Sequence, residues 1–516
     1  MSRKGRYGAR RKPKGGVRGS VGVSWVMRNN GARAFNLAVF SVALTAAAVA
    51  IPCGEAAADT LVWALVQAYQ NNPSLNAQRA SLRATDENVP QALSGYRPKL
   101  SITANGGENF TSVATQSYTN GLTGVLASGP CVGSFPAGCV AATTSVQTPY
   151  TSRGVGASAT ETLYNGMQTA NRVRQAESQV MGARETLRVT EQQVLLDAAT
   201  AYMNLLRDEA ILELNRRNVE VLTEQLKQTR DRFNVGEVTR TDVAQAESRL
   251  AAGRSALLGA QSNDMTSVGN YRRVIGVAPG KLAPGVPVDR FSPPNLNAAI
   301  SQGEAQSPSV SAASYGVDIA ELAVKINEGS LYPNLTLAAN VSQNWFPSDT
   351  TARQFLASIG GQLTIPIYQG GGEYSAIRQS KETLGQQRLN LDVNRDQARA
   401  TVVQNWGQLV AAKAQIEATT AQVNAAEIAL NGVREEARVG QRTTLDVLNA
   451  QQELVNARVA LVTAQHDRVV ASYTLLAAVG ALSVRTLGLT APIYDPEVHY
   501  QQVRDAWIGL RTPDGR

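Results

Sequence analysis

Cysteine, histidine and aromatic residues are scarce in this chain of 516 residues. The sequence has three cysteines and two histidines, and aromatic side chains make up 5% of it. No group of Cys and His residues has the spacing of a metal site. The two histidines, His466 and His499, lie in a helical repeat and in the C-terminal tail, far from any catalytic pattern. We therefore expect no enzymatic activity, no catalytic residue, no cofactor and no metal.

Long apolar runs are missing after residue 58. The one extended run, residues 35–51, follows 34 residues with ten Lys or Arg and no acid. Small residues then precede Asp59, and this order predicts a secretory signal peptide over residues 1–58. Met27 is an alternative start that would leave a conventional signal. Removing residues 1–58 changes the net charge from +8 to −1, which takes away the only support for nucleic-acid binding.

The sequence is internally duplicated with two offsets. Residues 71–74 (Asn-Asn-Pro-Ser) recur 235 positions later as residues 306–309 (Gln-Ser-Pro-Ser). From residues 164–166 (Tyr-Asn-Gly), which recur as residues 368–370 (Tyr-Gln-Gly), the offset is 204. The 31-residue difference predicts one longer loop in the first copy. A repeat of about 200 residues is too long for a solenoid unit and indicates a duplicated half.

Two cysteines, Cys131 and Cys139, fall inside the 31-residue insertion. Cys53 lies within the predicted signal, and the residues before it make a poor lipidation site. In an oxidising exported compartment, the remaining pair is expected to form a local disulfide, with two free thiols as the alternative.

Long helices are predicted over residues 166–234 and 370–438, which contain few helix breakers and repeat apolar residues every seven positions. A helix of about 65 residues would be roughly 100 Å long and calls for coiled-coil packing. The second return helix carries two neighbouring apolar stripes. One comprises Ala450, Leu454, Ala457, Leu461, Ala464, Ala471, Leu475 and Ala478, and the other Leu448, Val455, Val462, Val469 and Leu476. Two stripes predict packing on both sides, as in a cylinder of helices; a long globular bundle is the alternative.

Strands with one apolar face are predicted before the long helices. Leu100, Ile102 and Ala104 alternate with polar residues, and similar alternation recurs over residues 335–342 and 359–367. Each half thus supplies one hairpin of strands about ten residues long, enough to cross an outer membrane at a tilt. Four strands cannot close a barrel, and an open edge in lipid is prohibitive, so the chain should oligomerise. A soluble hairpin packed on the bundle is the alternative.

The order of signal, helix, strand hairpin, long helix, tight turn and return helix, repeated twice, resembles the TolC family of outer-membrane efflux proteins. The resemblance covers about residues 60–483. Its most specific parts are the turns at residues 232–243 (RFNVGEVTRTDV) and 438–448 (RVGQRTTLDVL). The family implies an α+β membrane protein: a homotrimer whose twelve-stranded transmembrane β-barrel, four strands per chain, continues into a coiled-coil α-helical tunnel in the periplasm.

Such ducts export drugs or proteins together with a periplasmic adaptor and an inner-membrane pump, from a position in the outer membrane. The domains expected here are a signal (1–58), a first repeat (59–278), a Pro-rich linker (279–294), a second repeat (295–483) and a peripheral tail (484–516). The first repeat places its strand hairpin at about 98–163 and its helical hairpin at about 166–276; the second places them at about 333–367 and 370–480. A periplasmic coiled-coil adaptor or structural protein is the alternative function.

The resemblance also implies roles for residues beside the two turns. The Val235-Gly236 and Val439-Gly440 turns would form the closed tip and contact the adaptor. Asp242 and Arg442 match positions that link neighbouring hairpins as a gate. Asp446 and Asn449 match two rings of a constriction, and here Asn449 replaces an acidic residue.

A second departure from the family is Ala437, which stands where a tyrosine would assist the gate. Both departures predict a weaker gate and a constriction that attracts cations less. Alternatively, Asp242 and Asp446 serve the first turns of the return helices, where carboxylates are favoured. Gly370-Gly371-Gly372 lacks the Lys and Ser/Thr of a phosphate loop and is expected to bend the chain between strand and helix.

We predict that Cys131 and Cys139 form a disulfide in the outward-facing loop of the first strand hairpin. Intact mass after alkylation, with and without prior reduction, should show two reactive thiols only after reduction. Labelling of both thiols without reductant would contradict the bond. Because the loop is absent from the second copy, the Cys131→Ser, Cys139→Ser variant should still assemble.

Overall fold

The computed structural model describes residues 59–120, 139–348, 350–513 and 515. All of them belong to one compact unit, residues 56–516. The predicted signal peptide and Cys131 lie outside the described residues, and for Cys139 only the backbone is described. The predicted disulfide therefore stays a prediction.

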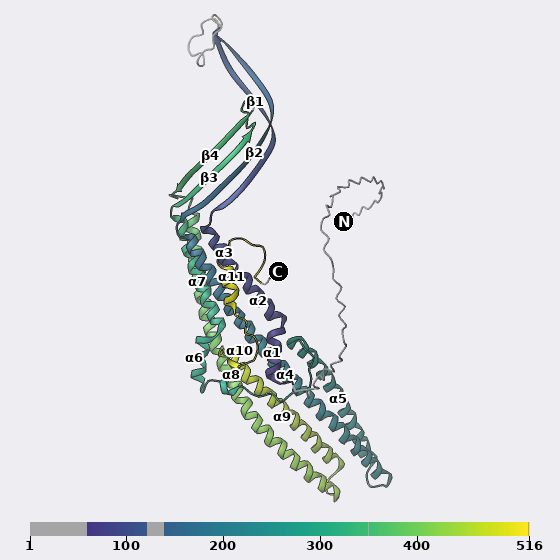
Figure 1. Cartoon of the computed structure of the whole chain (residues 1–516). Coiled ribbons are helices and arrows are strands. Elements are labelled where there is room, and N and C mark those ends of the chain that lie inside the picture. Colours follow the sequence, from purple (N-terminus) through teal and green to yellow (C-terminus); the bar gives the residue numbers. More distant parts are fainter. Residues whose placement is uncertain (1–58, 121–138, 349, 514, 516) are drawn as a thin grey trace, which may run out of the picture. The chain divides into compact units, whose positions relative to one another are not determined.

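Both halves follow one order of elements: short helices, two antiparallel strands, a very long helix and a return helix (Figure 1). The first half comprises α1 (Leu61–Asn71), α2 (Pro73–Asp86), α3 (Asn88–Leu93), β1 (Lys99–Asn120), β2 (Cys139–Asn165), α4 (Gln168–Asn234) and α5 (Arg240–Ile275). The second comprises α6 (Leu296–Gln306), α7 (Pro308–Glu328), β3 (Asn334–Trp345), β4 (Arg353–Thr364), α8 (Gly372–Arg438) and α9 (Thr444–Ala478), followed by α10 (Val484–Leu487) and α11 (Pro496–Val503). The 3₁₀ turns η1 (Ser94–Tyr96), η2 (Asp289–Phe291) and η3 (Gly329–Leu331) precede β1, α6 and β3.

The repeated Asn-Pro and Ser-Pro pairs mark the same break in each half. Asn72 ends α1 and caps α2, because its side-chain oxygen accepts a hydrogen bond from the Ser74 amide at 2.9 Å. Pro73 and Pro308 occupy the first positions of α2 and α7, where a missing N–H is tolerated. The duplicated motif thus encodes a helix break.

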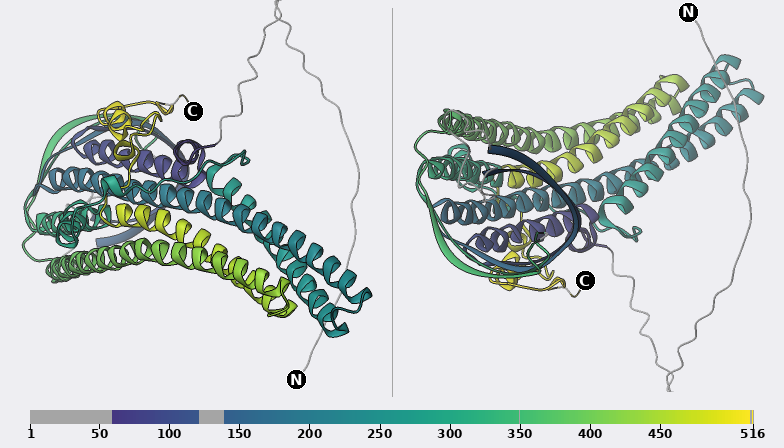
Figure 2. Two further views of the ribbon diagram at one scale, coloured as in Figure 1. Left: turned by 90° about the horizontal axis from the view of Figure 1, so that it is seen from below. Right: turned by 90° about the horizontal axis from the view of Figure 1, so that it is seen from above.

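The long helices α4 and α8 have 67 residues each, and α9 lies between α8 and α4 (Figure 2). On one side, Leu454 and Ala457 pack against Val423 and Leu430 of α8. On the other side, Leu448 packs into the first hairpin. The predicted two-sided packing of the return helix is confirmed. Within the described ranges, no helix is both long and apolar enough to cross a membrane.

The largest buried side chains lie where α4, α5 and the linker between the halves meet. Tyr202 and Tyr271 are fully buried, with ring centroids 6.4 Å apart. The Tyr202 hydroxyl lies 2.7 Å from the Asp59 carbonyl oxygen and 2.5 Å from that of Ala283. Burial is the main cause that raises the pKa of Tyr202 to about 12. The hydroxyl therefore stays protonated, and as a hydrogen-bond donor it holds residue 59 and the linker against the core.

The four strands form one antiparallel sheet in the order β1–β2–β3–β4, so paired residues share a face. One face carries the rows Leu100–Ala159–Ala339–Ile359 and Ile102–Ala157–Val341–Ala357. The other face carries Ser101–Ser158–Asn340–Ser358, Thr103–Gly156–Ser342–Leu356 and Asn105–Gly154–Asn344–Gln354. On the apolar face, Ile102 is 82% exposed and Ile359 is 77% exposed. The predicted alternation of an apolar and a polar face is confirmed.

The first strand hairpin is longer than expected. Strands β3 and β4 have 12 residues each, whereas β1 and β2 have 22 and 27. The expected length of about ten residues is therefore wrong for the first hairpin. The β1–β2 ladder continues past Arg153, where β2 last pairs with β3, as far as the Asn120–Cys139 pair. Part of the insertion extends the ladder, because its Ser and Thr residues are compatible with strand pairing.

The C-terminal tail, expected at the periphery, is anchored through α11. The His499 ring contacts Asp86 of α2, with Nδ1 2.9 Å from Oδ2, and the Asp86 side chain is fully buried. Burial raises the pKa of Asp86, and the hydrogen bond with His499 opposes that shift. The Arg184 guanidinium lies 5.3 Å from the Tyr500 ring. The tail thus bonds to helices of the first half.

We predict that Ile359→Arg impairs insertion of the sheet into the outer membrane. An arginine on a lipid-facing strand costs about 2–4 kcal/mol at mid-membrane, and Ile359 lies midway along β4 on the apolar face. Ser358→Arg is the matched control, because its side chain lies on the polar face. The yield of folded protein in outer-membrane fractions should fall for Ile359→Arg only. Equal yields would contradict the assignment of the faces.

Candidate functional site

The two helical-hairpin turns have the same backbone. In each, the glycine is left-handed, with φ of +84° at Gly236 and +81° at Gly440. The Gly236 amide bonds to the Phe233 carbonyl at 2.9 Å, and the Glu237 amide bonds to the Arg232 carbonyl at 2.9 Å. The same pattern of paired bonds closes α8, and it is the glycine-dependent helix end expected at such a turn. A Cβ at either glycine would meet nothing within 4 Å, so backbone conformation, not space, favours glycine.

Both return helices begin with a reciprocal cap. The Asp242 carboxylate accepts hydrogen bonds from the Thr239 amide at 2.9 Å and the Thr239 hydroxyl at 2.7 Å. Asp446 accepts the same two bonds from Thr443, at 3.0 and 2.8 Å. The bonds from the Thr239 hydroxyl and amide lower the pKa of Asp242, and those from the Thr443 amide and hydroxyl lower the pKa of Asp446. Both carboxylates therefore serve helix starts.

The predicted gate pair is not formed within the chain. Arg442 instead pairs with Glu436 of its own hairpin, with Nε 2.8 Å from Oε2. Asp242 is held by Thr239. Ala437 packs among the apolar residues of the second hairpin. The predicted pairing of Asp242 with Arg442 across neighbouring hairpins stays a prediction, and it now concerns hairpins of neighbouring copies.

The turns differ in the order of their charges. In the first turn Arg232 precedes the glycine and pairs with Glu237 after it, with Nε 2.8 Å from Oε2. In the second turn the acid, Glu436, comes before the glycine and the arginine after it. Val235 and Val439 at the tips are 74% and 72% exposed. Each tip thus presents one exposed valine beside an ion pair. The order of acid and arginine along the chain is reversed between the two tips.

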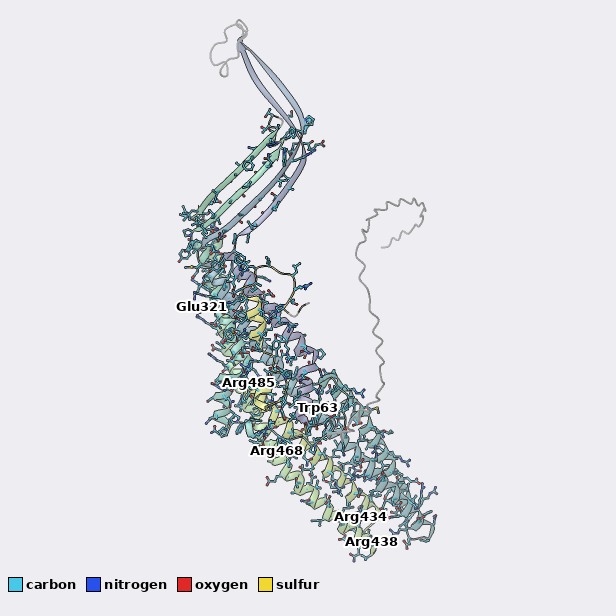
Figure 3. The ribbon with its side chains drawn as sticks, viewed as in Figure 1. Trp63, Glu321, Arg434, Arg438, Arg468 and Arg485 are labelled. Carbon is cyan, nitrogen blue, oxygen red and sulfur yellow. The ribbon has the colours of Figure 1, made fainter. Side chains whose placement is uncertain are left out.

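In each hairpin, a side-chain hydrogen bond joins the two helices a few turns above the tip. Arg230 bonds to Glu247 at 2.6 Å in the first hairpin. Arg434 bonds to Gln451 at 3.1 Å at the equivalent place in the second. Arg434 and Arg438 lie near the tip end of α8 (Figure 3). The bond is present at both duplicated positions, although its acceptor is a carboxylate in the first hairpin and a side-chain amide in the second.

Asn449, predicted in a constriction ring, contacts the other hairpin. Its Oδ1 accepts a hydrogen bond from Nη2 of Arg249 at 2.7 Å. Sequence reasoning missed Arg249, although one signal was present. No acidic residue lies three or four positions from Arg249 on its own helix, so an intrahelical ion pair was excluded. Among the described residues, no group of three or more His, Cys, Asp or Glu side chains could hold a metal.

Comparisons with known proteins agree with this architecture. The family model for outer membrane efflux proteins matches residues 64–277 and 299–481. The chain is 42% identical over 469 residues to the outer membrane efflux protein BepC of Brucella suis biovar 1 (strain 1330), covering 90% of this chain and 94% of BepC. It is 27% identical over 332 residues to the alkaline protease secretion protein AprF of Pseudomonas aeruginosa, covering 62% and 68% of the two chains.

A solved structure shows the same fold. The Campylobacter jejuni CmeC outer membrane channel superposes with a TM-score of 0.69 at 15% sequence identity. The match covers 86% of this chain and 89% of CmeC. The long helices and the four strands thus follow an architecture already seen in an outer membrane channel.

We predict that the first turn of α5 loosens in acid through Asp242. Because the folded-state pKa of Asp242 is lowered from 3.8, its stabilisation is present above that value and is lost as pH falls through the folded pKa. Hydrogen exchange of the Asp242 and Val243 amides should speed up more than for the core of α5. Thr239→Ala, which removes the hydroxyl partner and leaves the backbone amide of residue 239, should cost about 1 kcal/mol at neutral pH and weaken the acid response. Thr241→Ala is the control, and an identical acid response in Thr239→Ala would refute the prediction.

Proposed function

Because the chain belongs to the outer membrane efflux protein family, we propose that three copies of it build one export duct. Outer-membrane efflux is the family's function, and the resemblance to the TolC family is confirmed. The family is one of outer-membrane channels, which removes the periplasmic-adaptor alternative. The observation that carries the trimer proposal is a two-faced sheet whose edge strands, β1 and β4, have no further partner within the described chain.

The unpaired strand edges require partners in a membrane. In hydrocarbon, each backbone N–H or C=O left without a hydrogen bond costs several kcal/mol. Pairing β1 of one copy with β4 of the next would satisfy both edges and close a barrel. Three copies of four strands give the twelve strands that the family resemblance implies. The apolar rows would then face lipid.

Within the part of the chain that the structure describes, the helical layer also has two edges without a partner. Large apolar side chains stay exposed along α8 and α5: Leu389, Val393, Val403, Val410 and Ile428 on α8, and Leu258 and Met265 on α5. The two edges differ in sequence, so a contact between copies would be head-to-tail, and such a contact gives a ring when the rotation between copies closes. The same contact, repeated from each copy to the next, can thus close both the helical tunnel and the barrel.

The polar face of the sheet would line the passage. Apart from Leu356, its central rows carry hydroxyl, amide or glycine residues and no charge. Ser101 and Ser158 are linked through their hydroxyls at 2.7 Å. An uncharged wall of hydrogen-bonding groups favours a water-filled passage and gives little discrimination by charge. We infer that selection of cargo takes place nearer the helical tip.

We infer that the exposed Val235-Gly236 and Val439-Gly440 turns receive a periplasmic adaptor, which connects the duct to an inner-membrane pump. The support is the matched geometry and exposure of the two turns. For the cargo we propose drugs or proteins, because similar proteins carry the names of efflux and of alkaline protease secretion. The partner pump would decide between them. Neither catalysis nor nucleic-acid binding is part of this function.

We further propose that Asp242 and Arg442 pair between neighbouring copies as part of the gate, and that Asp446 and Asn449 border the constriction. Arg442 is exposed and lies beside the tip. Its bond to Glu436 would have to be shared or exchanged on assembly. If so, Arg442→Ser should raise single-channel conductance without changing the trimer.

The duct is tested by mass and conductance together. The detergent-solubilised particle should have the mass of three chains and form stable channels in planar bilayers. A monomer without channel activity would overturn the proposal. Met265→Arg on the α5 edge should lower the trimer fraction, because the charge would be buried at the contact between copies. Arg254→Lys, an exposed substitution on the same helix, is the control.

A further inference from the structure

The chain after α11 contains an exposed apolar segment, residues 507–510 (Trp-Ile-Gly-Leu). Trp507 is 69% exposed, Ile508 is 96% exposed, and the Leu510 side chain is open to solvent as well. Three large apolar side chains within four residues make a patch, whereas single exposed ones are ordinary on a protein surface. Such a patch is unfavourable in water, so we expect a partner to cover it.

Arg97 holds this segment at the base of β1. Its Nη1 donates a hydrogen bond to the Ala506 carbonyl oxygen at 2.7 Å, and its guanidinium carbon lies 4.5 Å from the centroid of the Trp507 ring. The bond is charge-assisted and the ring contact is a cation–π interaction, so both fix the position of the tail. The Arg97 backbone is itself fixed, because its amide bonds to the Ser94 carbonyl at the end of η1. Accordingly, the chain after α11 lies near α3 and the start of β1 (Figure 1).

Tyrosines indicate that this level is a boundary of the membrane. An exposed tyrosine lies at the end of each strand that is nearer the helices: Tyr96 before β1, Tyr164 in β2, Tyr332 before β3 and Tyr368 after β4. Tyrosine and tryptophan side chains collect where hydrocarbon meets water, at the rims of a membrane barrel. Because Arg97 directly follows Tyr96, its contact with Trp507 lies at the same rim.

We propose that residues 507–510 insert into the phospholipid leaflet at the base of the barrel, where Arg97 holds them at the depth of the headgroups. This inference rests on the proposed barrel. An indole suits such a boundary, because its ring is apolar and its N–H can meet water or a headgroup. Seen from above, the tail lies on the convex side of the curved strands (Figure 2), which is the side that a closed barrel turns to lipid.

The patch is continuous with the surface that the barrel would present to lipid. Leu100, three residues after Arg97, begins the apolar row of the sheet and is 80% exposed. Exposed Arg511 follows the patch, and an arginine can bond to lipid phosphate while its stem lies along apolar groups. A second copy of the chain is the other occupant to test. The tryptophan, the arginines and the level of the rim together favour phospholipid.

Fluorescence quenching measures the depth of the tail. In a background with Cys53→Ser, Cys131→Ser and Cys139→Ser, Ile508→Cys is labelled with an environment-sensitive fluorophore. The full protein is then reconstituted in vesicles of phosphatidylethanolamine and phosphatidylglycerol that carry a nitroxide either near the headgroup or near the end of the acyl chain. The nitroxide near the headgroup should quench the label more strongly, as for a probe about 5–10 Å below the surface. The same label on Gln502→Cys, an exposed position of α11, should be quenched only weakly by either lipid.

The variant Arg97→Ala tests the contact that positions the tail. It removes both the hydrogen bond to Ala506 and the cation–π contact, so quenching of the Ile508→Cys label by the nitroxide near the headgroup should fall to the level of Gln502→Cys. Lys99→Ala is the matched control, because it removes an equal charge two residues away, and it should leave the quenching as it is. Quenching that persists in full in Arg97→Ala would overturn the role given to Arg97.

The label on Ile359→Cys is the reference for insertion of the barrel. Ile359 lies midway along β4 on the apolar face, so the deeper nitroxide should quench it most. Quenching at Ile359→Cys without quenching at Ile508→Cys would overturn the inference and leave the barrel intact. In that case, shielding of the Ile508→Cys label from aqueous iodide would place a second copy on the patch. Absence of quenching at Ile359→Cys would instead overturn the proposed function.

Discussion

Backbone hydrogen bonds in the strands constrain everything else in this molecule. A four-stranded sheet has two edges, and neither edge can remain open in a hydrocarbon layer. The apolar and polar rows assign one side of the sheet to lipid and the other to water, so the edges can be satisfied only by curving the sheet into a closed wall. The proposed trimer and the circular arrangement of its helices are one way to achieve that closure.

The helical part meets the same requirement by different means. Helices satisfy their own backbone groups, so the cylinder is held by side chains alone. In α9, alanines let the backbone approach α8 closely, while Leu448 reaches the first hairpin. A helix with two packing faces can have a neighbouring helix on each side, as every helix of a closed ring must. Duplication of a half that already contains such a hairpin therefore widens the helical layer, and the proposed contacts between copies would close that layer into a tunnel.

Much of this fold could be predicted from patterns that depend on local chemistry. The seven-residue repeats predicted the long helices, the alternation of apolar and polar residues predicted the two-faced strands, and the Val-Gly pairs predicted the turns. The length of β1 and β2 was missed, because a Ser- and Thr-rich segment is equally compatible with a polar loop. The Arg249–Asn449 contact was also missed. It depends on how two helices 200 residues apart are rotated against each other, which a periodic pattern leaves undetermined.

The docking of α11 links the tail of the second half to α2 of the first half. Asp86 is fully buried in α2, and His499, which contacts it, lies 413 residues further along the chain. Without α11, this carboxylate lacks the hydrogen bond with His499 and keeps only its electrostatic attraction to Arg184 and Arg83. The final packing of α2 therefore includes a contact that only the tail can complete, so a short helix near one end of the described chain closes the fold around a residue near the other.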